Sequence, residues 1–300
     1  MANDVPENHG KHMTLTAAEL HAATAALAAA ARVPAAWLPP ARSRPGRAFL
    51  AALALAVLPA TRAAAVTVGG ELDVTSDYIY RGLSYSYGQP AEQLDLHVST
   101  MTGTFAGLFG STRNQNLEPG AAADLQLYLG QRFMLSDTWN ATLEAYGHHY
   151  AGGKQDAHND YEEFALSFSY LDLWNVRIAA LPNDVRYTNN GETRAGRYAA
   201  YVAETATQWQ LWRPALFLTA GAGFYYVGSG ANPAYSEMYR TDVPQKLPSS
   251  GYAYGNVGLA YQHRRWRLDV GYFLAQQRAQ QLLPYPTANR HVAATLSWSF

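Results

Sequence analysis

Residues 291–300 read His-Val-Ala-Ala-Thr-Leu-Ser-Trp-Ser-Phe, and the alternation in this stretch sets the pattern for most of the chain. Val292 and Leu296 fall on one parity, whereas Thr295 and Ser297 fall on the other. Successive side chains of a β-strand point to opposite faces, so the stretch predicts a strand with one apolar and one polar face.

The same period of two returns from residue 66 onward. Segments of this kind start near residues 68, 91, 103, 122, 139, 161, 173, 198, 214, 252, 266 and 290. Short connections (101–103, 135–138, 171–173, 209–213 and 263–265) alternate with long ones (82–90, 112–121, 151–160, 182–197, 227–251 and 276–289), which hold Pro119, Pro182, Pro233, Pro244, Pro248, Pro284 and Pro286. Short turns on one side and long loops on the other predict an all-β fold, a transmembrane antiparallel up-and-down β-barrel of about 12 strands.

Residues 1–65 are predicted to be a leader rather than part of the barrel, which then spans residues 66–300. Ala48–Leu58 is apolar and too short to cross a bilayer as a helix, but its length suits the central part of a signal peptide. Arginines precede it, and Ala63–Ala65 offers a cleavage site of small residues. Met1–Pro40 is too long for the basic part of a signal, which favours a start codon assigned too far upstream.

The composition agrees with a barrel in an outer membrane. The chain has no cysteine, 15% charged residues and 21 tyrosines. A soluble domain carries about 25% charged residues. The net charge of −1 gives no reason to expect a nucleic-acid partner.

A second motif opens the chain after the leader. Residues 76–84 read Ser-Asp-Tyr-Ile-Tyr-Arg-Gly-Leu-Ser, followed by Ser86, Pro90, Ala91 and Gln93, and later by Phe105–Ser111. This region resembles the opening of the TorF family of proteobacterial porins, and the resemblance covers about 45 residues. It implies an outer-membrane barrel that acts as a pore. The alternating end at Phe300 resembles the C-terminal signal read by the barrel-assembly machinery, which is thus an expected partner.

The polar parity is expected to line the pore, at Asp77, Arg81, Asp95, His97, Glu144, His148, Arg177, Glu204, Arg267 and Asp269. If the first hairpin is centred near residue 86, Asp77 faces Asp95 with Arg81 one diagonal away. Such a cluster could stiffen the wall or select ions, and the excess of acids favours cations. Twelve strands predict a narrow lumen, and the length of loop 227–251 would let it fold inward.

Tryptophan positions predict one rim of the barrel. Each of Trp139, Trp174, Trp209, Trp212, Trp266 and Trp298 lies beside a short turn or the C-terminus. Most tyrosines fall at the opposite strand ends. Trp and Tyr prefer the membrane–water interface, so outer-membrane lipids are expected partners.

The function predicted from these features is passive diffusion of small solutes or ions through a narrow polar lumen. The alternatives are a structural or adhesive barrel with Tyr-rich loops and, third, an outer-membrane hydrolase. No spacing of Ser, His and Asp singles out a catalytic triad, so no catalytic residue and no cofactor is predicted. His148 and His149 are adjacent on a strand and point to opposite faces, so no metal site is predicted, although His158 could join one of them.

Overall fold

The computed structural model describes residues 66–114, 121–152, 160–171, 173–188, 193–213, 215–232, 245–247, 249–283 and 285–300. The predicted leader therefore lies outside the described residues. Gly69–His97 and Gly103–Phe300 form one compact unit, which contains most of the barrel wall. No helix in the described part of the chain is long and apolar enough to cross a membrane.

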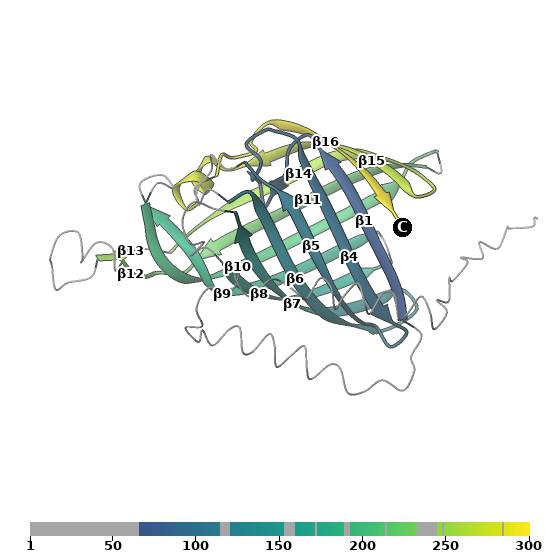
Figure 1. Ribbon diagram of the computed structural model, residues 1–300, viewed down its shortest axis with the longest axis horizontal. Helices are drawn as coiled ribbons and strands as arrows, with labels where there is room; N and C mark the ends of the chain where they lie inside the picture. The colour runs from purple at the N-terminus through teal and green to yellow at the C-terminus, as the bar shows by residue number, and fades with distance from the viewer. Residues whose placement is uncertain are drawn as a thin grey trace, which may run out of the picture. The chain divides into compact units, whose positions relative to one another are not determined.

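The fold is a closed barrel of twelve antiparallel strands, which confirms the predicted class and strand number. Figure 1 shows the strands running obliquely beside one another, with β1 next to β16. The wall strands are β1 (Val66–Thr75), β4 (Ala91–Thr100), β5 (Thr104–Thr112), β6 (Ala123–Met134), β7 (Trp139–Ala151), β8 (Tyr161–Tyr170), β9 (Trp174–Thr188), β10 (Thr193–Gln210), β11 (Leu216–Val227), β14 (Ser250–His263), β15 (Trp266–Ala275) and β16 (His291–Ser299).

Four short strands and one 3-10 helix stand apart from the wall. β2 (Ile79–Tyr80) pairs with β3 (Leu83–Ser84), and β12 (Gly230–Asn232) pairs with β13 (Gln245–Leu247). The 3-10 helix η3 (Gln277–Gln281) lies between β15 and β16.

The first and last wall strands close the barrel. Leu72 pairs with Trp298 and Val74 with Leu296. At the seam, the Gly70 and Phe300 backbones exchange N–H···O bonds of 3.2 and 2.9 Å. The Phe300 ring lies so close over Gly70 that a Cβ there would sit 2.4 Å from it. Closure leaves no edge strand with unpaired backbone N–H and C=O groups in the wall. A β-sheet in an apolar solvent must pair all of these groups within itself.

The outward parity of the wall is apolar and open. Its Leu, Ile and Val side chains are between 43 and 60% exposed: Leu72, Val74, Leu125, Leu127, Leu143, Ile178, Val257, Leu259, Leu268, Val270, Val292 and Leu296. These residues come from seven wall strands, so the apolar surface encircles the barrel rather than forming one patch.

One predicted long loop is wrong. Residues 182–197 were expected to be a loop, but β9 continues to Thr188 and β10 begins at Thr193, which leaves only four residues between them. Pro182 therefore lies within β9. The β9–β10 pairing shifts register between Tyr198 and Ala200, opposite Asp184 and Leu181. A proline lacks the N–H that a regular ladder needs, and a bulge is where a strand can accept one.

Candidate functional site in the barrel lumen

Residues 76–90, here called the inner hairpin, leave the wall after β1 and fold into the lumen. The predicted open hairpin centred near residue 86 is therefore wrong, because β1 ends at Thr75 and does not continue to Arg81. The turn between β2 and β3 is made by Arg81 and Gly82, with φ of 50° and 75°. Two positive φ values at a two-residue turn are typical of a type I′ hairpin.

The tip of the inner hairpin is pressed against the wall. A Cβ added to Gly82 would lie 2.6 Å from Tyr254 Cβ on β14 and 2.9 Å from Ala275 Cβ on β15. The turn thus requires glycine both for its conformation and for its close approach.

Asp77 holds the base of the inner hairpin together. Its Oδ1 accepts hydrogen bonds from Ser84 Oγ at 2.5 Å, from Ser86 Oγ at 2.7 Å and from the Gly88 N–H at 3.3 Å. Its Oδ2 lies 3.0 Å from His291 Nε2 at the start of β16. Asp77 is 2% exposed. Asp77 therefore organises the hairpin. The prediction that Asp77 faces Asp95 is wrong.

Arg81 reaches from the hairpin tip to the far wall. Its Nη2 donates to both oxygens of Glu163 on β8, at 2.9 and 2.8 Å. Its Nε lies 3.7 Å from Glu204 Oε1 on β10, and its guanidinium covers the Tyr80 ring at 4.7 Å. Burial alone would lower the pKa of Arg81, but Glu163 and Glu204 raise it above its ordinary value, so the side chain stays charged.

Arg177 on β9 joins the same carboxylates from the wall. It donates to Glu163 and, from Nη1 at 3.0 Å, to Glu204 Oε2, and its Nε lies 3.8 Å from Glu144 Oε2. Two arginines thus share three glutamates. Neutral donors complete the network: Tyr254 OH donates to Glu204 at 2.6 Å, Tyr146 OH to Glu144 at 3.0 Å and Ser167 Oγ to Glu144 at 3.4 Å.

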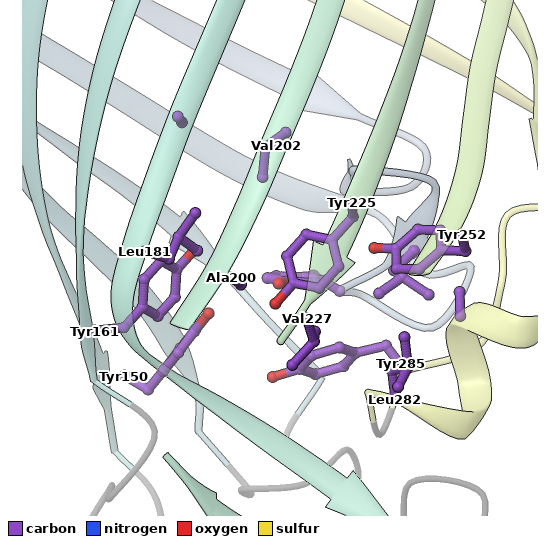
Figure 2. Packing of buried hydrophobic residues seen from close by; sticks show 14 of the residues in the cluster. Tyr150, Tyr161, Leu181, Ala200, Val202, Tyr225, Val227, Tyr252, Leu282 and Tyr285 are labelled. Atoms are coloured by element: carbon purple, nitrogen blue, oxygen red, sulfur yellow. The ribbon is translucent and has the colours of Figure 1, made fainter. Parts of the chain in front are cut away.

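Tyrosines and aliphatic side chains also surround the hairpin. Figure 2 shows Tyr150, Tyr161, Tyr225, Tyr252 and Tyr285 gathered with Leu181, Ala200, Val202, Val227 and Leu282 inside the ring of strands. The buried cluster also includes Tyr78, Leu83 and Tyr85 of the hairpin. The rings of Tyr85 and Tyr285 lie 4.4 Å apart, and the Arg113 guanidinium lies 4.7 Å from the Tyr85 ring.

Three further hydrogen bonds anchor the hairpin. Tyr78 OH donates to Asp124 Oδ2 on β6 at 3.0 Å. The backbone of β3 pairs with the segment before β16, where Ser84 N–H donates to Pro286 O at 2.9 Å and Ala288 N–H to Gly82 O at 2.8 Å. Burial raises the pKa of Tyr78 and of Tyr85 well above the ordinary tyrosine value.

Three cavities border the hairpin. The first, of about 390 Å³, is lined by Asp77, Tyr78, Gln93, Gln126, Asn256 and Asp269 among others. The second, of about 280 Å³, lies between Tyr80, Tyr146, His148 and the arginine–glutamate network. The third lies between the hairpin and the tyrosine cluster and holds only about 30 Å³.

The remaining residues predicted to line the pore lie in two smaller clusters and beside the hairpin. On β4, Asp95 accepts hydrogen bonds from Tyr128 OH at 2.7 Å and contacts His97 Nδ1 at 2.7 Å. On β15, Arg267 binds Asp269 through two bonds of 2.7 and 2.9 Å. The His148 ring stacks on Tyr161 at 4.1 Å, close to Tyr80 of the hairpin.

The two adjacent histidines point apart, as expected from strand geometry. His148 is buried, whereas His149 Nδ1 lies 2.8 Å from Asp160 Oδ2 on a more exposed side. His158 lies outside the described residues. Across the described residues, no group of three His, Asp or Glu side chains is placed to hold a metal ion.

Glu163 is the central lumen residue that the sequence analysis missed. It is 1% exposed and binds both arginines. The signal was present, because Glu163 shares parity with Ala165 and Ser167, which alternate with the apolar Phe164, Leu166 and Phe168.

The tryptophans lie where the short connections are. Trp139, Trp174 and Trp266 begin their strands, and Trp209 and Trp298 lie near strand ends. Trp174, Trp209, Trp212 and Trp266 are between 45 and 82% exposed. Ring contacts join Trp139 to Trp174 at 6.2 Å and Trp266 to Trp298 at 6.3 Å.

Comparisons with known proteins give one family match and several distant structural ones. Residues 59–238 match the family model Gcw_chp, described as a bacterial protein of unknown function. The NanC porin aligns over 78% of this chain and 98% of its own, with 12% identity and a TM-score of 0.43. An outer-membrane channel from Pseudomonas putida F1 aligns over 77% and 94%, with 10% identity and a TM-score of 0.43. No curated protein matches the chain.

Proposed function

The chain belongs to the Gcw_chp family of bacterial proteins of unknown function. For this member of the family we propose the function of an outer-membrane channel for small solutes. The observation that carries the proposal is the two-sided wall. Half-exposed aliphatic side chains encircle the outside, while ion pairs and tyrosine hydroxyls fill the inside. An apolar surface this continuous suits contact with hydrocarbon rather than water.

The position of the tryptophans supports a membrane location. Five of the six predicted rim residues lie at or near strand ends, and Trp212 lies in the short connection after β10. Indole rings favour the membrane–water interface. The resemblance of residues 76–93 to the opening of TorF porins points the same way, and the Phe300 seam suits recognition of the chain end during assembly.

The lumen chemistry favours cations. On the inward parity of the described strands, carboxylates outnumber guanidinium groups: Glu71, Asp73, Asp95, Asp124, Glu144, Glu163, Glu204 and Asp269 against Arg132, Arg177 and Arg267. Fixed charges of one sign along a narrow path lower the energy of an ion of opposite charge inside that path. The ten residues predicted to line the pore are proposed to act together in this selection.

A structural barrel is the second candidate, and one observation favours it. The inner hairpin lies across the lumen and leaves only about 30 Å³ between itself and the tyrosine cluster. A permanently closed barrel would conduct nothing.

Purified protein in planar bilayers tests the two candidates. Stepwise conductance with a cation-selective reversal potential is the expected result. Clear anion preference would refute the selectivity argument. Silence of the wild-type protein and of a variant whose hairpin has been shown to be released would refute the channel and leave the structural barrel.

A further inference from the structure

We propose that the inner hairpin is a gate, and that the Arg81–Glu163 ion pair is the latch that holds it shut. The effect on conduction rests on the proposed channel function, whereas the latch itself is a statement about the hairpin alone. The hairpin blocks the path, it is attached at its base, and its tip is held by a buried ion pair together with backbone bonds to the segment before β16.

The hairpin blocks the path because its contacts extend around the wall. Tyr78 binds Asp124 on β6, Arg81 binds Glu163 on β8 and approaches Glu204 on β10, and Gly82 packs on Tyr254 of β14. A segment that touches strands on different sides of a closed barrel crosses its lumen. Beside the hairpin the structure leaves cavities of about 390 and 280 Å³, but only about 30 Å³ at the tyrosine cluster. Passage of a hydrated ion or a small solute past the tyrosine cluster therefore requires the hairpin to move.

The hairpin is held in one shape at its base, so it can move as a rigid unit. Asp77 ties Ser84, Ser86 and Gly88 to one carboxylate, so the segment keeps its shape through local bonds. Tyr87 and Gly88 follow with φ of 61° and 69°, and a Cβ at Gly88 would have no heavy atom within 4 Å. This end of the segment therefore has open space around it.

The tip depends on Arg81. Its side chain is 4% exposed and that of Glu163 is 1% exposed, and two hydrogen bonds join them. Removing one member of a buried, hydrogen-bonded ion pair leaves the other uncompensated, which is strongly unfavourable. Glu163 keeps Arg177 as a partner when Arg81 is lost, so the wall retains a neutralised carboxylate while the hairpin loses its strongest contact.

The absence of cysteine makes the gate directly testable. Leu83 is 1% exposed and forms a bridge with Thr287. The flanking bonds from Ser84 to Pro286 and from Ala288 to Gly82 make Leu83 and Thr287 a non-hydrogen-bonded pair. Such pairs have Cα atoms about 4.5 Å apart, which is within the range for a disulfide. Leu83→Cys alone reports exposure, and Leu83→Cys with Thr287→Cys can lock the hairpin.

The experiment measures maleimide labelling of the Leu83→Cys protein in phospholipid vesicles. Adding Arg81→Gln or Glu163→Gln is expected to raise the labelling rate about tenfold or more, and Arg81→Lys is expected to give a smaller rise because lysine keeps the charge but not the two-pronged geometry. Arg267→Gln is the matched control, since it removes a lumen arginine whose partner is Asp269. Unchanged labelling in both latch variants, or an equal rise in the control, would overturn the latch.

Conductance then separates the gate from the channel. In the double-cysteine protein, the oxidised form is expected to conduct less than the reduced form, and Arg81→Gln is expected to conduct more than wild type. Faster labelling of Arg81→Gln without conductance would keep the latch and refute the channel. A conductance that is the same in the oxidised and reduced double-cysteine protein, and the same in Arg81→Gln and wild type, would refute the gate and keep the channel.

Discussion

Replacing Leu127 by arginine tests whether the outer surface faces hydrocarbon. Leu127 lies on the outward parity of β6, is 45% exposed and pairs with Leu108 and Gly147. At about 3.4 Å per residue and a strand tilt of about 40°, it lies about 4 Å from the midpoint of β6 along the membrane normal. Phe133, also 45% exposed, lies about 12 Å from the same midpoint by the same estimate.

The two positions should therefore respond differently. An arginine on the lipid face costs about 2–4 kcal/mol at the bilayer midplane and about 0–1 kcal/mol near the interface. Leu127→Arg is expected to lower the free energy of unfolding by the larger amount and Phe133→Arg by the smaller. Alanine variants at both positions separate the cost of the charge from the loss of the original side chain.

The assay is urea unfolding in phospholipid vesicles, followed by tryptophan fluorescence. In water, a substitution at an exposed site changes stability by no more than about 0.5 kcal/mol. Equal small effects at both positions would therefore mean that the apolar parity does not face lipid, and the membrane assignment would fail with it.

Three further predictions follow from the hairpin and the seam. Gly82→Ala should destabilise the docked hairpin by about 1–3 kcal/mol through backbone strain and the clash with Tyr254; an unchanged urea midpoint would contradict the tight turn. The raised pKa of Tyr78 and Tyr85 favours their neutral forms in the closed state. Closure should therefore be complete below about pH 10, the pKa of an unfolded tyrosine, and weaken as the pH rises above it. Bilayer conductance is expected to rise across this range, and a conductance that falls would contradict the prediction. Deleting Phe300 should lower the folded yield in heat-modifiable electrophoresis, because the seam loses its ring and two backbone bonds; full yield would show that the chain end is dispensable.

The barrel wall could be predicted from the sequence because the residue pattern that specifies each strand is local. Each strand needs only alternate residues to be apolar, and that pattern is visible within ten positions. All twelve strands are present, from β1 at Val66 to β16 at His291. The one wrong loop, 182–197, came from reading Pro182 as a loop residue, since the register shift that lets a strand accept it depends on the partner strand.

The inner hairpin could not be predicted from the same rule. Tyr78 and Tyr80 continue the parity of Leu72 and Val74, so the pattern extended the first strand past its real end at Thr75. What turns these residues inward is a set of contacts with partners far along the chain. Arg81 and Glu163 are 82 positions apart, and alternation carries no information about which lumen residues meet.

The position of the hairpin in the chain has a consequence for biogenesis. It lies near the start of the described residues, yet its partners Glu163 and Glu204 are on β8 and β10, and the segment it pairs with precedes β16. Contacts between residues so distant in sequence form late. The hairpin can dock only where Glu163, Glu204 and the segment around Thr287 are already in place, so we expect the lumen to be filled only after the strands that carry these partners have folded.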